Sequence, residues 1–478
     1  MSDPTRIIRR AAARLSRRPS LGVAVGAYGL HLLLLLLCRP FTPDGVHYQP
    51  WTSDRLMQTV ALEDLRASPW DSLDHLHIHP PALDLARALL ARLTPHAAPD
   101  TALRFVDGGL LLLWGLFYAL AGGLAYRWAR EAAGPRMGLL TAAAVLLHPA
   151  TIFYASTLDT TLPTAALTLA LLYLLTRARD GRLRTALLLA GAYLLLFFTR
   201  ALYQWPFPFL LAGSLLLLRA PRRTVLTFLV TTVLISGLHV EKQHARFGTW
   251  FTSTLSGFNL VRSVGIDDTE GYLHLMDARA ATPGPTGDGP AVLTRAFIAP
   301  GVPNYNHADY LAENHRLLDV YHAHLKTLPL GDLLRDYAFN LWLYVQPSSR
   351  YTRHAVVDRL PWRKAADRLA SFPAGLLPLG LAGLAWGAAL RRGGRRTAAA
   401  LALPVGAVFL LSVLCEQGEN MRYRFFLEPA AVVFVGVWAP RSRALIRSWR
   451  RRPDPAAPPA PRPAAAPDPA PRAAEAEA

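Results

Sequence analysis

The stretch LGVAVGAYGLHLLLLLLC (Leu21–Cys38) is followed closely by SDRLMQTVALEDLRASPWDSLDHLHIHPPALDLARALL (Ser53–Leu90). The first stretch is apolar and free of acids and of Lys or Arg over a length that crosses a bilayer with some tilt, which predicts a membrane helix. The second stretch concentrates acids, histidines and a Pro-Pro pair soon after that helix. A plain connecting loop needs none of these residues, so the second stretch is a candidate functional segment.

Similar apolar blocks recur along the 478-residue chain, which is 52% hydrophobic. Short arginine-rich turns separate them, an alternation typical of polytopic membrane proteins. The sequence therefore predicts an all-α polytopic membrane protein with about ten transmembrane helices and two large extracytoplasmic segments. The predicted spans are Leu21–Cys38, Leu103–Tyr126, Met137–Phe153, Pro163–Leu175, Thr185–Phe198, Pro206–Leu218, Val225–Val240, Phe372–Leu390, Ala398–Leu414 and Phe425–Ala439.

Basic residues mark one side of these spans. Arginines precede the first span, fill alternate turns and open the C-terminal tail. By the positive-inside rule that side is the cytoplasm, so we expect a multi-pass plasma-membrane protein with both termini inside. The turn arginines include Arg127, Arg130, Arg136, Arg177, Arg179, Arg182, Arg184, Arg219, Arg222, Arg223, Arg391, Arg392, Arg395 and Arg396.

This topology predicts the domain organisation. The N-terminal basic segment leads into an uncleaved signal anchor, and the Pro/Ala-rich tail lacks the apolar content to fold, so we expect it to be disordered in the cytoplasm. The predicted units are a cytoplasmic N-terminus (1–20), a seven-span module (21–240) with its outer loop (39–101), a large extracytoplasmic segment (241–371), three C-terminal spans (372–440) and the tail (441–478).

Composition argues against two classes of partner. The net charge of +18 raises the question of nucleic acid, but the arginines sit at the ends of apolar blocks and no nucleic-acid module is recognisable. The two cysteines, Cys38 and Cys415, belong to no CxxC motif, which disfavours a zinc or redox site built on thiols. Both are expected near the outer face, and whether they pair is left open.

A few ionisable residues break the charge rule by lying near the outer face. They are Asp159 in FYASTLDTTLP, Arg200 in FFTRALYQW, and Arg422 and Arg424 in CEQGENMRYRFFLEP. Ionisable groups at membrane level usually mark function, and guanidinium groups clamp phosphate bidentately. An anion at the outer leaflet is therefore one candidate for what holds these arginines there. The structural alternative is that they pair with Glu416, Glu419 or Glu428 and only tie helix ends together.

The segment after the first span combines a predicted helix with a turn. DRLMQTVALEDLRA, from Asp54, has apolar residues at helical spacing and should end near Ser68, because Pro69 restricts the residue before it. Such a helix can lie in the membrane interface. Asp54 stands at its first turn, so an N-cap role is the structural alternative to a chemical one. Pro80–Pro81 disfavours helix through His79 and favours a new helix starting at Pro81.

Three alternating histidines, His75, His77 and His79, raise the question of a metal. No carboxylate or cysteine completes a known ligand spacing around them. The sequence therefore predicts no metal site here.

The order of these elements resembles the GT-C integral-membrane glycosyltransferases, which include protein O-mannosyltransferases and bacterial aminoarabinose transferases. A first span precedes WTSDRLMQTVALEDL, in which an acid opens an amphipathic helix, and then the PP-type segment HIHPPALDLARALL. A seven-span block and a large outer segment follow. RFGTWFTSTLSGFNL and GENMRYRFFLEPAAVV are also similar to elements of bacterial members. The likeness covers residues from about 20 to 440, and it depends on the order of the elements and on topology.

The resemblance implies an enzyme that moves a hexosyl or pentosyl group from a polyprenyl-phosphate carrier to a hydroxyl of a glycan, lipid or protein at the outer face. It implies a first-loop aspartate as general base: Asp54, or Asp44 in TPDGVHY as the second candidate. A single displacement would invert the anomeric carbon. The expected substrate-binding residues are Asp159, Arg200, His79, Arg422 and Arg424. We expect no cofactor or metal besides the lipid-linked donor.

Two other classes of function remain as alternatives. A polytopic transporter or lipid-linked-sugar flippase is favoured if the charged residues line a path across the bilayer, whereas the exceptions here cluster at one face. A non-catalytic membrane partner in envelope assembly is the second alternative, and the concentration of His, Asp and Arg around an apparent carrier site argues against it.

Overall fold

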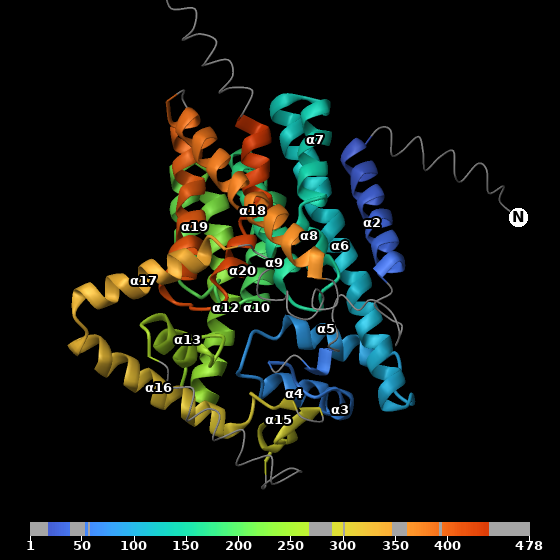
Figure 1. Cartoon of the computed structure of the whole chain (residues 1–478), viewed down its shortest axis with the longest axis vertical. Helices are drawn as coiled ribbons and strands as arrows, with labels where there is room; N and C mark the ends of the chain where they lie inside the picture. Colours follow the sequence, from blue (N-terminus) through green and yellow to red (C-terminus); the bar gives the residue numbers. More distant parts are fainter. Residues whose placement is uncertain are drawn as a thin grey trace, which may run out of the picture.

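The computed structural model describes residues 18–38, 53–55, 58–266, 289–299, 302–346, 361–391 and 394–438. Long helices form a bundle, and a layer of shorter elements lies across one end of it (Figure 1). The bundle helices are α2 (Pro19–Cys38), α6 (Pro99–Ala133), α7 (Pro135–Leu146), α8 (Pro149–Ala155), α9 (Thr161–Arg177), α10 (Leu183–Thr199), α11 (Phe207–Leu217), α12 (Arg222–Phe247), α18 (Pro361–Arg391) and α19 (Arg395–Leu414), with a last helix over residues 428–438.

A helix lies at each of the predicted spans, but not all of these helices are long enough to cross a membrane. Among the described residues, five helices are long and apolar enough, or six if the pair α7 and α8 is one span. That pair is bent by 60°, because Pro149 disfavours helical geometry at His148 and then starts α8 at its first position. α10, α11 and residues 375–390 are shorter apolar helices, so ten crossings stays a prediction.

Turns rich in arginine gather at the other end of the bundle, away from the layer of short elements. Glu131, near the end of α6, forms an ion pair with Arg177 at the end of α9. The Nε of Arg179 donates to the carbonyl of Leu218 over 3.1 Å, which joins the turn after α9 to the turn after α11. Three of the basic turns thus lie side by side, as the alternation of charge along the sequence requires.

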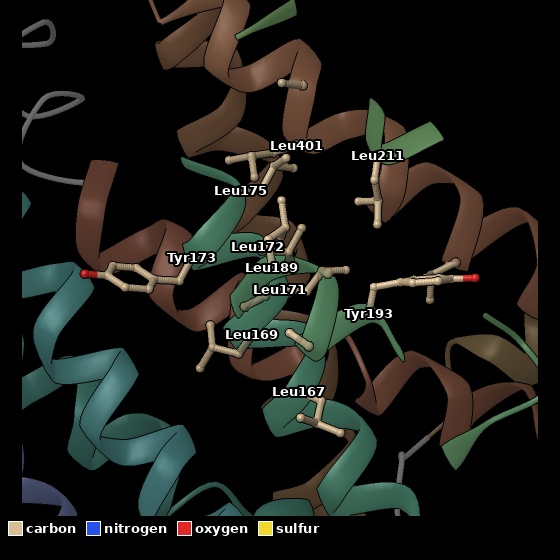
Figure 2. Packing of buried hydrophobic residues seen from close by; sticks show 14 of the residues in the cluster. Leu167, Leu169, Leu171, Leu172, Tyr173, Leu175, Leu189, Tyr193, Leu211 and Leu401 are labelled. Carbon is tan, nitrogen blue, oxygen red and sulfur yellow. The ribbon is translucent and has the colours of Figure 1, made fainter. Parts of the chain in front are cut away.

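The core of the bundle is centred on α9. Nearly every residue of α9 is buried, as expected for a helix that is apolar all round. Figure 2 shows its leucines packed with Leu189 of α10, Leu211 of α11 and Leu401 of α19. Because α9 is surrounded, the residues just before it, including Asp159, are fixed where three or more helices meet.

The layer of shorter elements consists of two segments that pack together, and we call it the polar layer (Figure 1, lower part). The first segment contains η1 (Ser53–Arg55), α3 (Leu62–Ala67), α4 (Pro69–Asp74) and α5 (Ala82–Ala91). The second contains α13 (Ser256–Ser263), α15 (Ala291–Thr294), the antiparallel strands β1 (Phe297–Ala299) and β2 (Val302–Pro303), α16 (Ala308–Thr327) and α17 (Leu330–Tyr344). α20 (Asn420–Phe425) leads from α19 into the last helix.

The helix predicted from Asp54 to Ser68 is wrong in its extent. A 3₁₀ turn holds Asp54, and the α-helix starts only at Leu62, with Ala61 before it and no side-chain cap. Asp54 is therefore not the N-cap of this helix. The pattern of apolar residues failed because Val60 and Leu65 are buried within the polar layer rather than lined up along one continuous helix. The prediction after Pro80–Pro81 is confirmed within one residue, since α5 starts at Ala82 with Pro81 before it.

Buried polar contacts join the two segments of the polar layer. His77 Nδ1 lies 2.7 Å from Thr254 Oγ1, and the side chain of Asn306 accepts from the backbone N–H of His77 over 2.7 Å. Burial lowers the pKa of His77 to about 3, so the ring is neutral. Its hydrogen bonds hold the two segments together. Arg295 adds an ion pair with Asp64, 2.7 Å between Nη2 and Oδ1.

The close approach of α13 to α16 gives a test of this packing. A Cβ on Gly257 would lie 2.5 Å from the carbonyl oxygen of Asn314, and backbone cannot yield as a side chain can. We expect Gly257→Ala to lower the free energy of unfolding by about 1–3 kcal/mol, measured by thermal unfolding in detergent. Gly331→Ala is the matched control, because nothing lies within 4 Å of its Cβ position. Equal stability of both variants would contradict the packing described.

Candidate functional site

A buried arginine on α5 organises the first half of the candidate site. Arg87 is fully buried, and its Nη1 donates to Asp84 Oδ1 and to the carbonyl of Val60, each over 2.6 Å. Its Nε donates to Ser53 Oγ over 3.1 Å, and its Nη2 pairs with Asp54. Asp84 and Arg87 share a face of α5 because they are three residues apart, and the Pro-Pro turn directs that face inward.

Asp54 is held at the edge of this arginine cluster. Its side chain is 14% exposed, whereas those of Arg87 and Asp84 are 0% exposed, so of these three Asp54 alone reaches the surface. Burial raises the pKa of Asp54; the charge of Arg87 opposes this rise and the charge of Asp84 adds to it. A carboxyl group with a raised pKa accepts a proton more readily than an ordinary aspartate.

A third carboxylate completes the surroundings. Asp107 of α6 accepts from the backbone N–H of Ser53 over 3.1 Å, and Asp84 accepts from the N–H of Val60 over 3.3 Å. Both bonds fix the backbone on either side of Asp54. Asp84, Arg87 and Asp107 were missed in the sequence, although the Asp84–Arg87 spacing after a Pro-Pro turn and an acid inside an apolar span were available signals.

The three histidines do not converge. His75 Nδ1 lies 3.0 Å from the carbonyl of Asp71, while His77 bonds Thr254 and Asn306. His79 Nδ1 lies 2.6 Å from the carbonyl of Pro80, and its Nε2 lies 3.4 Å from Asp84 Oδ2. Within the described ranges, no group of three His, Cys, Asp or Glu side chains is arranged to hold a metal ion.

His79 links the Arg87 cluster to Arg200. Burial lowers the pKa of His79, the charge of Asp84 opposes this, and the charges of Arg200 and Arg87 lower it further. Arg200 follows the end of α10, so its guanidinium group stands within electrostatic reach of a ring that also contacts the first cluster. Asp54 and His79 thus both contact the Arg87–Asp84 pair, and the charge of Arg200, from a segment distant in sequence, acts on His79.

The second half of the site surrounds Arg422 on α20. Arg422 Nη2 lies 3.5 Å from Asp159 Oδ2, Nη1 lies 3.0 Å from Glu419 Oε2, and Nε donates to Thr161 Oγ1 over 2.8 Å. The N–H of Thr161 donates to Asp159 Oδ1 over 2.7 Å. Asp159 is thus fixed at the start of α9 and, with Glu419, holds Arg422 at this end of the bundle.

Arg200 lies against the aromatic side chains next to Arg422. Its guanidinium carbon is 5.4 Å from the ring centre of Tyr423 and 5.5 Å from that of Phe426, the geometry of a cation–π contact. Its Nη2 lies 3.9 Å from Glu419 Oε2. Glu419 therefore faces both Arg200 and Arg422.

Arg424 lies apart from these two arginines. It is fully buried, its Nε donates to Glu428 Oε1 over 2.8 Å, and its Nη1 donates to the carbonyl of Tyr344 over 2.9 Å. These contacts tie α17 to the last helix. The ion pairs Arg422–Glu419 and Arg424–Glu428 match the structural alternative raised from the sequence. Asp44 lies outside the described residues.

The chain is similar to known proteins in structure and not in sequence. No family model matches the chain, and no curated protein matches its sequence. Among solved structures, the chain is similar to the archaeal oligosaccharyltransferase AglB from Archaeoglobus fulgidus in complex with an inhibitory peptide and a dolichol-phosphate, with 12% sequence identity and a TM-score of 0.45. The match covers 91% of this chain and 52% of that one, so this chain spans about half the length of the AglB chain. At this TM-score the likeness carries no conclusion about activity.

The Arg87 cluster gives a second test. Removing one partner of a buried ion pair leaves an uncompensated charge, so we expect Arg87→Leu to lower the free energy of unfolding by about 3–5 kcal/mol. Arg335→Leu is the control: Arg335 pairs with Asp332 but its side chain is 78% exposed, and such pairs contribute less than about 1 kcal/mol. Thermal unfolding in detergent measures both variants. A small effect of Arg87→Leu would mean that the cluster does not hold the polar layer together.

Proposed function

We propose that the protein is a glycosyltransferase that moves a sugar from a polyprenyl-phosphate carrier to an acceptor hydroxyl at the outer face of the plasma membrane. One observation carries the proposal: a partly exposed carboxylate with a raised pKa, Asp54, lies at the same end of an apolar bundle as the arginine pair Arg200 and Arg422. Transfer from a lipid phosphate requires a general base and a positively charged site that binds the phosphate, both held close to lipid.

In the proposed reaction Asp54 acts as general base. It takes the proton of the acceptor hydroxyl as the oxygen attacks the anomeric carbon, while the bond from that carbon to the phosphate oxygen breaks. A positioned carboxylate contributes about 10²–10⁴-fold to such a step. Because one displacement occurs, the anomeric configuration inverts. Asp44 remains the second candidate for this role.

Arg200 and Arg422 are proposed to bind the phosphate and stabilise the charge that it gains as the sugar leaves. The leaving group is already an anion, so no general acid is needed. Asp159 would position Arg422. His79 would hold the part of the site that binds the acceptor hydroxyl next to Arg200. The reaction as proposed uses no metal. Arg424 is assigned to the fold, because its contacts are with Glu428 and the Tyr344 carbonyl.

The proposed orientation has both termini in the cytoplasm and the polar layer outside. In a protein without its native cysteines, we expect an impermeant thiol reagent to label a cysteine introduced at Gly331 in intact cells. A cysteine introduced at Gly181, in a basic turn, should react only after the cells are opened. The reverse pattern would overturn the orientation and place the proposed site on the wrong side.

The proposed base is tested by Asp54→Asn. We expect transfer from a polyprenyl-phosphate sugar to fall by at least about 100-fold, because the amide cannot take the proton. Donor binding and folding are retained, because Asp84 still compensates the charge of Arg87 and the amide oxygen can still accept from it. Asp309→Asn is the control, an exposed acid on α16 whose loss should leave transfer unchanged. Full activity of Asp54→Asn with loss in Asp44→Asn would move the role to Asp44. Activity in both variants would remove the general-base mechanism.

A further inference from the structure

The arginine pair proposed for the carrier phosphate already faces an internal anion. A single oxygen of Glu419, Oε2, lies 3.0 Å from Arg422 Nη1 and 3.9 Å from Arg200 Nη2. Carboxylate and phosphate oxygens offer guanidinium groups the same kind of acceptor. Glu419 and an incoming phosphate therefore compete for the same donors.

Arg200 is held in place by contacts that do not depend on Glu419. The rings of Tyr423 and Phe426 support its guanidinium face. Its Nε and Nη2 are buried and make no hydrogen bond within the part of the chain that the structure describes. A buried donor without an acceptor is unfavourable, so Glu419 satisfies Arg200 only in part. A phosphate that accepts these donors would remove that penalty.

The charges of the described residues around Glu419 balance closely. Arg422 faces it from α20, Arg200 faces it from the end of α10, and the charge of Arg262 from α13 acts on the neighbouring Glu416. The acids in this group are Asp159, Glu416 and Glu419. With all six groups ionised the net charge is zero. One added proton makes it +1, which matches the single negative charge of a phosphodiester such as a sugar-linked carrier.

We propose that Glu419 is a resident counterion that the phosphate of the carrier displaces, and that a proton from solvent is kept on the Glu416–Glu419 pair while phosphate is bound. This inference rests on the proposed function and adds to it how the site is regulated. The phosphate takes over the donors of Arg200 and Arg422. The proton neutralises one of the two carboxylates. Without it, both carboxylates and the phosphate would be negative, and the nearby arginines would not supply enough positive charge to offset them.

The sign of the pH dependence follows from this arrangement. Burial, and after it the charge of Glu419, raise the pKa of Glu416 to about 8, and its carboxylate also accepts from the Tyr423 hydroxyl. A bound phosphate adds negative charge and raises this pKa further. Below about pH 8 the pair holds its proton with or without phosphate, so affinity is constant. Above that pH, binding takes up a proton, and affinity falls by up to about tenfold per pH unit.

The test measures binding of citronellyl methyl phosphate, a prenyl phosphodiester with one fixed charge, to the full-length protein in lipid nanodiscs by calorimetry. We expect Glu419→Gln to bind at least about tenfold tighter than wild type at neutral pH, because the competitor is gone. Its loss of affinity should begin at a lower pH than in wild type, below about pH 8, because the charge that raises the pKa of Glu416 is also gone. Glu313→Gln on α16, where Glu313 pairs with Arg316, is the matched control and should bind like wild type.

Each other outcome decides against the proposal. Equal or weaker binding by folded Glu419→Gln would mean that Glu419 only positions Arg422. A third outcome is that wild type binds, Arg200→Gln does not bind, and Glu419→Gln binds no tighter than wild type. This would overturn the counterion role and leave the proposed function standing. No binding by either wild type or Glu419→Gln would overturn both. If Glu419→Gln does not fold, Glu416→Gln decides: it mimics the protonated pair, so its affinity should not change with pH, and a wild-type profile contradicts the proposal.

Discussion

The guanidinium group of Arg87 is the interaction on which the candidate site depends. An arginine with no exposed surface loses its hydration, a penalty of several kcal/mol that only close partners can offset. Asp54, Asp84, Ser53 Oγ and the Val60 carbonyl supply those partners from three separate turns of chain. The requirement to satisfy Arg87 therefore determines where Asp54 lies and how far it is exposed.

A second set of charges is satisfied in the same way but less completely. Arg424 donates through Nε and Nη1, which ties α17 to the last helix, and keeps one buried nitrogen, Nη2, without a hydrogen bond among the described residues. Arg422 is shared between Asp159 and Glu419, and Arg200 keeps buried nitrogens without a hydrogen bond among the described residues. The arginines at one end of the apolar bundle thus differ in how completely acceptors and counterions satisfy them. The arginines with the fewest such partners are the ones that a phosphate would stabilise most.

The sequence predicted the features that depend on hydrophobicity along the chain. The helices of the bundle and the turn at Pro80–Pro81 lie where periodicity and proline geometry put them. The continuous helix from Asp54 was not predicted correctly, because the burial of Val60 and Leu65 against the rest of the polar layer replaced the amphipathic surface that the pattern implied. The sequence signals that Arg87 and Asp107 are unusual, but not their partners, because Arg87 contacts Val60 across 27 residues and Asp107 contacts Ser53 across 54.

The most direct test of the central claim is turnover of a lipid-linked sugar by the purified protein in liposomes. Polyprenyl-phosphate sugars, radiolabelled in the sugar, would be supplied with acceptor hydroxyls, and both the carrier and the product analysed. The account predicts that the bond between sugar and phosphate is cleaved and that the label appears on the acceptor with inverted anomeric configuration. Movement of the intact donor across the bilayer, without cleavage of that bond, would contradict the account and identify a transporter instead.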